Sequence, residues 1–269
     1  SRRRRTRDPR AGSMSAPSPL LEFFKRGEVA RDVRLLAAQG GFAPRADEQL
    51  AILVHLLEDP DPEIRQTADE TLNNIPVAAL AAFLARPDIS IGLREFFADR
   101  GIFPDVDVTI DFDQPLIDTG EEDDPDFSND TMDRETVTQK LQKMNFTQRL
   151  KAAVKGSKEM RMVLVRDTNR MIAAAVMSSP KMTEQEVEAV AGMGSVSEDV
   201  LRIIANNRGW MKNYKIALRL VKNPKTPVAI SMNLLGRVME RDMVGLATDR
   251  NVPEPLRIAA RKKVLVART

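Results

Sequence analysis

The stretch Val221-Lys222-Asn223-Pro224-Lys225-Thr226-Pro227 decides how this sequence is interpreted. It ends one run of apolar residues at helical spacing and begins another, because prolines disfavour the helical conformation in the residue before them. A weaker copy, Met177-Ser178-Ser179-Pro180-Lys181-Met182-Thr183, lies forty-four residues earlier. Self-similarity at this scale is typical of stacked helical repeats. The sequence therefore predicts an all-α chain built of short helices.

The apolar spacing places several of these helices in the C-terminal half of the chain. Thr183 and Glu186 have the spacing of a capping box, so a helix is expected to begin there. Longer runs predict single helices over residues 136–155, 210–221, 227–238 and 254–266. The string LRIIA at 201–205 is echoed by LRIAA at 256–260, fifty-five residues later. The predicted fold is a right-handed α-solenoid of short repeats. The repeats are degenerate, because their spacings differ.

Composition narrows the class of protein. The chain has 269 residues, of which 42% are hydrophobic and 30% charged, as is ordinary for a soluble globular protein. No apolar run approaches the roughly 18 residues of a membrane-spanning helix, so no membrane insertion is expected. The absence of cysteine excludes disulfides, thiolate metal sites and cysteine nucleophiles, and it fits a cytoplasmic protein.

Charge is distributed very unevenly along the chain. Residues 1–13 carry a net charge of +5, residues 14–133 carry −17, and residues 134–269 carry +14. Two halves of opposite sign indicate that the chain meets charged partners.

Four segments follow from these patterns. Residues 1–19 are expected to be a disordered basic tail, and Met14 is a plausible natural start within it. Residues 20–104 form an acidic helical domain, 105–133 an acidic linker, and 134–269 a basic helical-repeat domain. At the start of the linker, aspartates alternate with apolar residues with the period of two of a short strand. Disorder is the alternative, because a solitary strand is marginally stable.

Two parts of the chain resemble known repeat families. The string LLEDPDPEIRQTADETL at 56–72 resembles a HEAT repeat, and its neighbours do so loosely. The NPKTP turn at 223–227 is similar to the turns of leucine-rich repeat variant and armadillo-like proteins, a resemblance that covers most of residues 160–266. It implies an α-solenoid, a fold usually used for binding rather than catalysis. Some leucine-rich repeat variant proteins hold an iron–sulfur cluster through cysteines, which this chain lacks.

Signatures of catalytic and cofactor sites are missing. His55 is the single histidine, so it offers neither metal-ligand spacing nor a base–nucleophile pair, and it is expected to be an ordinary helical residue. The acidic run lacks the glycine of an EF-hand loop, and the Gly192-Met193-Gly194 string follows no strand that would make it a phosphate loop. We therefore expect a protein that is not an enzyme, with no catalytic residue, cofactor, metal or small-molecule substrate.

One arrangement of basic residues is a candidate binding surface. Five of them recur at intervals of four and three, within an arc of about 80° on the helix predicted around Trp210. They are Arg208, Lys212, Lys215, Arg219 and Lys222. The opposite arc is apolar and holds Trp210, Tyr214, Leu218 and Val221, so the two aromatic residues are expected in the core rather than as base-stacking surfaces. Arg257 and Arg261 add charge near the C-terminus, where they also complement a helix dipole. The plain alternative is a solvated outer face.

These features predict a non-catalytic scaffold that binds protein partners through charged faces, with an acidic partner on the C-terminal face. The alternative is a nucleic-acid-binding protein, whose basic C-terminal segment contacts phosphates and is gated by the acidic linker. The two differ in salt dependence, because counterion release makes the binding of nucleic acid fall steeply as salt rises.

Overall fold

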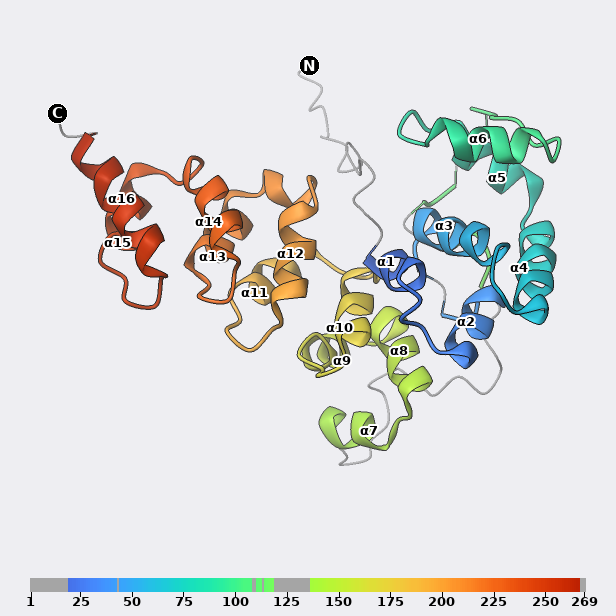
Figure 1. Cartoon of the computed structure of the whole chain (residues 1–269), viewed down its shortest axis with the longest axis horizontal. Coiled ribbons are helices and arrows are strands. Elements are labelled where there is room, and N and C mark those ends of the chain that lie inside the picture. The colour runs from blue at the N-terminus through green and yellow to red at the C-terminus, as the bar shows by residue number, and fades with distance from the viewer. Residues whose placement is uncertain (1–18, 43, 108–109, 113, 119–135, 267–269) are drawn as a thin grey trace, which may run out of the picture.

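The structure, a computed structural model, describes residues 19–42, 44–107, 110–112, 114–118 and 136–266. Within these ranges every regular element is helical, with sixteen α-helices and one short 3-10 helix, so the all-α prediction is confirmed. Helices α8 to α16 follow one another in chain order from the middle of an elongated molecule to one end, whereas α1 lies in the middle and α2 to α6 lie toward the other end (Figure 1). None of the helices in the described ranges is long and apolar enough to cross a membrane.

The helices are short. Those before the acidic segment are α1 (Pro19–Lys25), α2 (Arg31–Ala38), α3 (Ala46–Leu56), α4 (Pro62–Asn74), α5 (Val77–Leu84) and α6 (Ile91–Ala98). Those after it begin with α7 (Val137–Lys143), α8 (Phe146–Lys155), α9 (Lys158–Leu164), α10 (Arg170–Met177), α11 (Glu184–Ala191) and α12 (Glu198–Asn206). The last are η1 (Trp210–Lys212), α13 (Tyr214–Lys222), α14 (Val228–Leu235), α15 (Glu240–Leu246) and α16 (Glu254–Val266).

Side-chain caps set several helix starts, one of which the sequence predicts. The Asp61 side chain accepts a hydrogen bond from the backbone N–H of Glu63, with Pro62 at the first position of α4. The capping box of Thr183 and Glu186 is formed at the start of α11. The helix predicted at 254–266 is α16 with the same bounds.

Three predicted helices have different bounds. The single helix expected at 136–155 is two, because Asn145 forms a capping box with Gln148 and starts α8. The helix expected at 210–221 is interrupted at Asn213, which caps α13. The helix expected at 227–238 ends at Leu235, and a separate helix, α15, follows it without having been predicted.

The described part of the acidic segment contains no strand. Residues 105–107, 110–112 and 114–118 form bends, a turn and irregular backbone. The alternation of aspartate and apolar residues therefore does not produce a strand there. The basic tail up to residue 18 and the acidic run at 119–133 lie outside the described residues.

Helix α10 lies at the centre of the packing. Each residue from Met171 to Met177 is buried, and the helix contacts α8, α9, α12 and α1. Helix α1 also packs on α3, where the backbone N–H of Leu20 donates to the buried carboxylate of Glu48 at 2.7 Å. Two helices that are far apart in the sequence, α1 and α10, therefore lie side by side (Figure 1).

The two Pro-Lys turns that are forty-four residues apart make equivalent contacts. The Ser179 hydroxyl donates to the Val154 carbonyl at the end of α8, and it accepts from the N–H of Lys181. The Asn223 amide donates to two carbonyls at the end of α11, those of Ala191 and Met193, both at 2.9 Å, and its oxygen accepts from the N–H of Lys225. Each turn thus satisfies orphan carbonyls of an earlier helix while it closes its own loop.

Candidate functional site

Three of the predicted basic residues form an exposed face on α13. Lys215, Arg219 and Lys222 are exposed and recur at intervals of four and three. The opposite face of the helix is buried: Ile216, Ala217, Leu220 and Val221. The helix therefore presents its cations to solvent while its apolar face enters the core.

Arg208 and Lys212 do not share that helix. Arg208 lies in the turn after α12 and Lys212 ends η1, and both side chains are exposed. The break comes at Asn213, whose side chain accepts a hydrogen bond from the N–H of Lys215 at 3.0 Å. The five-residue stripe on one continuous helix is therefore wrong. An asparagine before an apolar-periodic run is a helix-start signal, and it was present in the sequence.

The exposed cations of this region differ in their partners. The Arg219 Nε atom lies 3.6 Å from the Glu188 carboxylate on α11. Among the residues that the structure describes, Lys212 and Lys215 make no side-chain hydrogen bond or ion pair. Arg208 likewise makes none within the described ranges, whereas Lys222 interacts electrostatically with Asp242. The side chains of Arg208, Lys212 and Lys215 are therefore the cations of this region most available to an external anion.

The two aromatic residues belong to the packing. Trp210 is 8% exposed, as expected of a core residue. Tyr214 is half-buried, and its hydroxyl donates to Asp242 at 2.5 Å and accepts from the Met239 N–H at 3.2 Å. Burial raises the pKa of Tyr214 and the bond to Asp242 adds to the effect, while the same bond is the main cause of the lowered pKa of Asp242. Leu218 is half-buried, so the core face of α13 is rotated from the predicted one.

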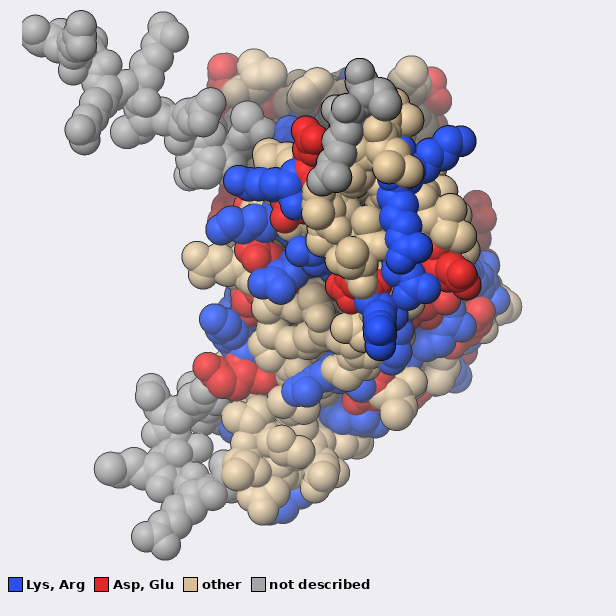
Figure 2. Space-filling view, turned by 90° about the vertical axis from the view of Figure 1, so that its left-hand side faces the viewer, with Lys and Arg blue, Asp and Glu red and all other residues tan. Residues whose placement is uncertain are grey.

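Arg257 and Arg261 lie on a different helix, α16. Arg257 is half-buried, whereas Arg261 is exposed and donates from Nε to the Ala247 carbonyl at the end of α15, at 2.9 Å. Arg261 thus stabilises a helix C-terminus, although not that of its own helix. Both α13 and α16 pack on α14. Figure 2 shows Lys and Arg side chains at this end of the molecule interspersed with Asp, Glu and uncharged residues, rather than gathered in one basic field.

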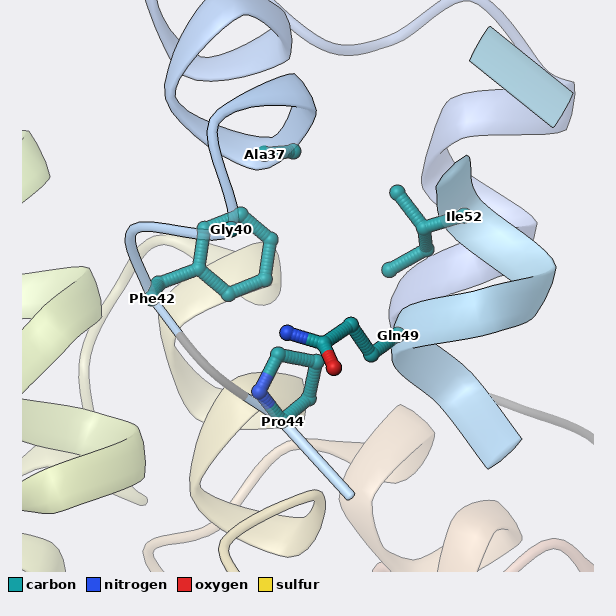
Figure 3. Close-up of a pocket in the computed structure, with 6 residues that line it drawn as sticks. All are labelled: Ala37, Gly40, Phe42, Pro44, Gln49 and Ile52. Atoms are coloured by element: carbon teal, nitrogen blue, oxygen red, sulfur yellow. The ribbon is translucent and has the colours of Figure 1, made fainter. Parts of the chain in front are cut away.

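A small pocket lies beside α3. Its cavity volume is about 10 Å³, and it is lined by Ala37, Gly40, Phe42, Pro44, Gln49 and Ile52. Figure 3 shows the Gln49 amide directed from α3 toward Phe42 and Pro44 of the preceding loop. Pockets that bind small molecules usually enclose about 300–1,000 Å³, so this one is too small for such a ligand.

Gln49 is the polar residue beside the pocket, and nothing in the sequence pattern had singled it out. It is 2% exposed. Its Oε1 accepts from the N–H of Leu116 at 2.8 Å and from that of Ile117 at 3.2 Å, and its Nε2 donates to the Ile117 carbonyl at 2.5 Å. One buried side chain thus binds the backbone of two consecutive residues of the acidic segment.

A buried ion pair joins α9 to α11. The Arg161 guanidinium donates to Glu186 at 2.6 Å, and the two side chains are 5% and 1% exposed. Burial by itself would raise the pKa of Glu186, but hydrogen bonds from Thr183 and Arg161 outweigh it and hold that pKa below its usual value. The terminal nitrogens of Arg161 also donate to the carbonyls of Gly156 and Lys181, whereas its buried Nε atom has no hydrogen-bond partner among the described residues. Because the pair is buried and joins two helices, we assign it a structural role.

Metal sites and similar proteins give no further indication of function. In the described ranges, no group of three or more His, Cys, Asp or Glu side chains is arranged to hold a metal ion, and His55 is a half-buried residue of the last turn of α3. The chain matches no protein-family model, no curated protein and no solved structure.

Proposed function

We propose that the chain is a non-catalytic scaffold that binds an acidic protein partner through the exposed cations around α13. The observation that carries the proposal is the exposure of Lys212 and Lys215, which have no side-chain partner among the described residues. An exposed lysine without a partner keeps its full charge available, because no internal carboxylate must be displaced before an external anion binds.

The proposed architecture behind this surface is a right-handed α-solenoid of two helical segments that an acidic segment joins. The equivalent contacts of Ser179 and Asn223, at the same position of two turns, support stacked repeats. In such an array each unit buries its apolar face against its neighbours and leaves a long outer surface for binding.

The test compares two charge reversals of equal size in the full chain. Lys212→Glu/Lys215→Glu changes the proposed surface, and Lys158→Glu/Arg250→Glu makes the same change in net charge at exposed positions on α9 and after α15. Fluorescence anisotropy measures the binding of a labelled polyglutamate peptide as a mimic of an acidic partner. The first variant should bind about five- to tenfold more weakly, since each exposed ion pair contributes about 0.2–1 kcal/mol and reversal adds repulsion of similar size. An equal loss in both variants would refute a specific role for this face.

The second candidate function is nucleic-acid binding. It is favoured by the same exposed cations and by the ion pair of 2.9 Å between Lys155 of α8 and Asp118, where the acidic segment contacts the basic half of the chain. Labelled random duplex and single strand, titrated at about 50 and 200 mM salt, distinguish the two functions. If Lys212 and Lys215 bind phosphates, the slope of log K against log salt should fall by about two in their double variant. Duplex binding that persists at the higher salt, with no binding of polyglutamate, would replace the scaffold proposal.

A further inference from the structure

The buried amide of Gln49 recognises a main chain rather than a side chain. All three of its hydrogen bonds that the structure shows go to backbone atoms of Leu116 and Ile117, two to N–H groups and one to a carbonyl. An amide that binds backbone places no requirement on the identity of the residues it holds.

The segment that Gln49 holds lies at the surface of the molecule. None of the described residues from Phe103 to Asp118 is buried, although Gln49 beneath them is. A buried receptor group under a half-exposed chain is the arrangement of a binding site with its ligand, in contrast to α10, where every residue from Met171 to Met177 is buried.

Two side-chain contacts flank the amide. The Phe112 ring lies 6.1 Å from the Phe83 ring of α5 in an edge-to-face arrangement, and the Arg86 guanidinium lies 4.9 Å from the centre of the Phe112 ring. Asp118 forms its ion pair with Lys155 at the other side. The site therefore combines an aromatic and cationic contact, a backbone-binding amide and a lysine.

We propose that this surface on α3, α5 and α8 is a peptide-binding site, occupied in this chain by residues 110–112 and 114–118. Its partner is a linear segment of another protein with the same order of side chains as the internal segment. That order is an aromatic residue, then two consecutive apolar residues in irregular backbone, then a carboxylate. The inference extends the proposed protein-binding role to a second surface, and it does not depend on Lys212 or Lys215.

The internal segment and a partner segment exchange at the same site. The internal segment has the advantage of a high effective concentration, because it is part of the same chain. A partner must therefore compete with it, and binding should become much tighter once the internal segment can no longer contact Gln49.

The test measures the binding of a labelled peptide with the sequence of residues 110–118 to the wild-type chain and to three variants of the full chain. Leu116→Pro/Ile117→Pro removes the two N–H donors to Gln49 from the internal segment without changing the site. Val106→Pro/Asp107→Pro places the same pair of prolines at exposed positions as a matched control. The third form adds Gln49→Leu to the first variant, which removes the amide while keeping a similar volume.

Anisotropy should show at least tenfold tighter peptide binding to Leu116→Pro/Ile117→Pro than to the wild type or to the control. The added Gln49→Leu change should abolish that gain, and a peptide with proline at the two corresponding positions should not bind. Failure of the peptide to bind a variant whose far-UV circular dichroism matches the wild type would overturn the proposal.

A further variant keeps the test valid if the proline substitutions unfold the chain. Phe112→Ser/Asp118→Ser removes the side-chain contacts and leaves the backbone contacts, and it should raise peptide affinity by a smaller factor. A wild-type chain that forms a dimer through this segment, shown by sedimentation and lost in the proline variant, would also overturn the proposal, since the occupant would then be a second copy. Polyglutamate binding at Lys212 and Lys215 remains measurable in all these forms, so failure here is distinct from failure of the proposed function.

Discussion

Replacing Glu186 by alanine tests whether the buried ion pair between α9 and α11 holds the helices together. The change leaves the Arg161 guanidinium 95% buried without its carboxylate, and it removes the acceptor of the Thr183 N–H and hydroxyl groups. Breaking a buried pair on one side costs about 3–5 kcal/mol. Because Arg161 still donates to the carbonyls of Gly156 and Lys181, we expect a loss near the lower limit, about 3 kcal/mol.

The matched control is Glu188→Ala, two residues along the same helix. Its carboxylate lies 3.6 Å from an Arg219 side chain that is 58% exposed. An exposed pair of this kind contributes about 0–1 kcal/mol, and the two substitutions share the same change in helix propensity.

Urea unfolding followed by far-UV circular dichroism measures the difference. With a urea dependence of about 3 kcal/mol per molar, Glu186→Ala should lower the midpoint by about 1 M and Glu188→Ala by at most about 0.3 M. The double change Arg161→Met/Glu186→Leu should recover more than half of the loss, because apolar residues of similar volume replace a buried pair at little net cost. Equal midpoints for the two single variants would refute the assignment of a structural role.

Three further outcomes are expected. Because folding lowers the pKa of Glu186, the unfolded chain binds a proton at this side chain at a higher pH than the folded chain does. The contribution of Glu186 to stability is therefore complete above the usual pKa of 4.5 and is lost as the pH falls below that value. Between pH 7 and pH 3 the urea midpoint of the wild type should therefore fall further than that of Glu186→Ala, and parallel curves would contradict this. Tyr214 is the single tyrosine, so absorbance at alkaline pH reports its ionisation alone; the midpoint should lie above 10.0 and move down toward it in Asp242→Asn. Asn223→Ala, which removes two bonds to carbonyls, should lower the free energy of unfolding by about 2 kcal/mol, against about 1 kcal/mol for Ser179→Ala, as compared by urea unfolding.

The sequence predicts the helices of this chain better than their ends. Apolar periodicity identifies α16 with its observed bounds, because a long amphipathic run needs no information from its neighbours. Asn145 and Asn213 divide runs that look continuous, since a single side-chain cap outweighs a weak helical propensity at the junction. Helix α15 was missed because its seven residues are too few for a clear period.

The basic surface was partly predictable and the peptide-binding site was not. Lys215, Arg219 and Lys222 follow from spacing along one helix, which is local information. The contacts of Gln49 join residues 67 and 68 positions apart, and no local pattern of charge or hydropathy encodes which loop returns to which helix. Glutamine is a common residue in amphipathic helices, so the sequence does not single out Gln49. Its contacts are seen only in the three-dimensional structure.

The contact between α1 and α10 has a consequence for the order in which the chain matures on the ribosome. Residues 26–169 separate the two helices, so α1 leaves the exit tunnel long before the surface that covers it has been synthesised. At roughly 5–20 residues per second, this interval lasts roughly 7–30 s. During that time α1 can pack on α3 but not on α10, so α1 reaches its final environment only once α10 has been synthesised.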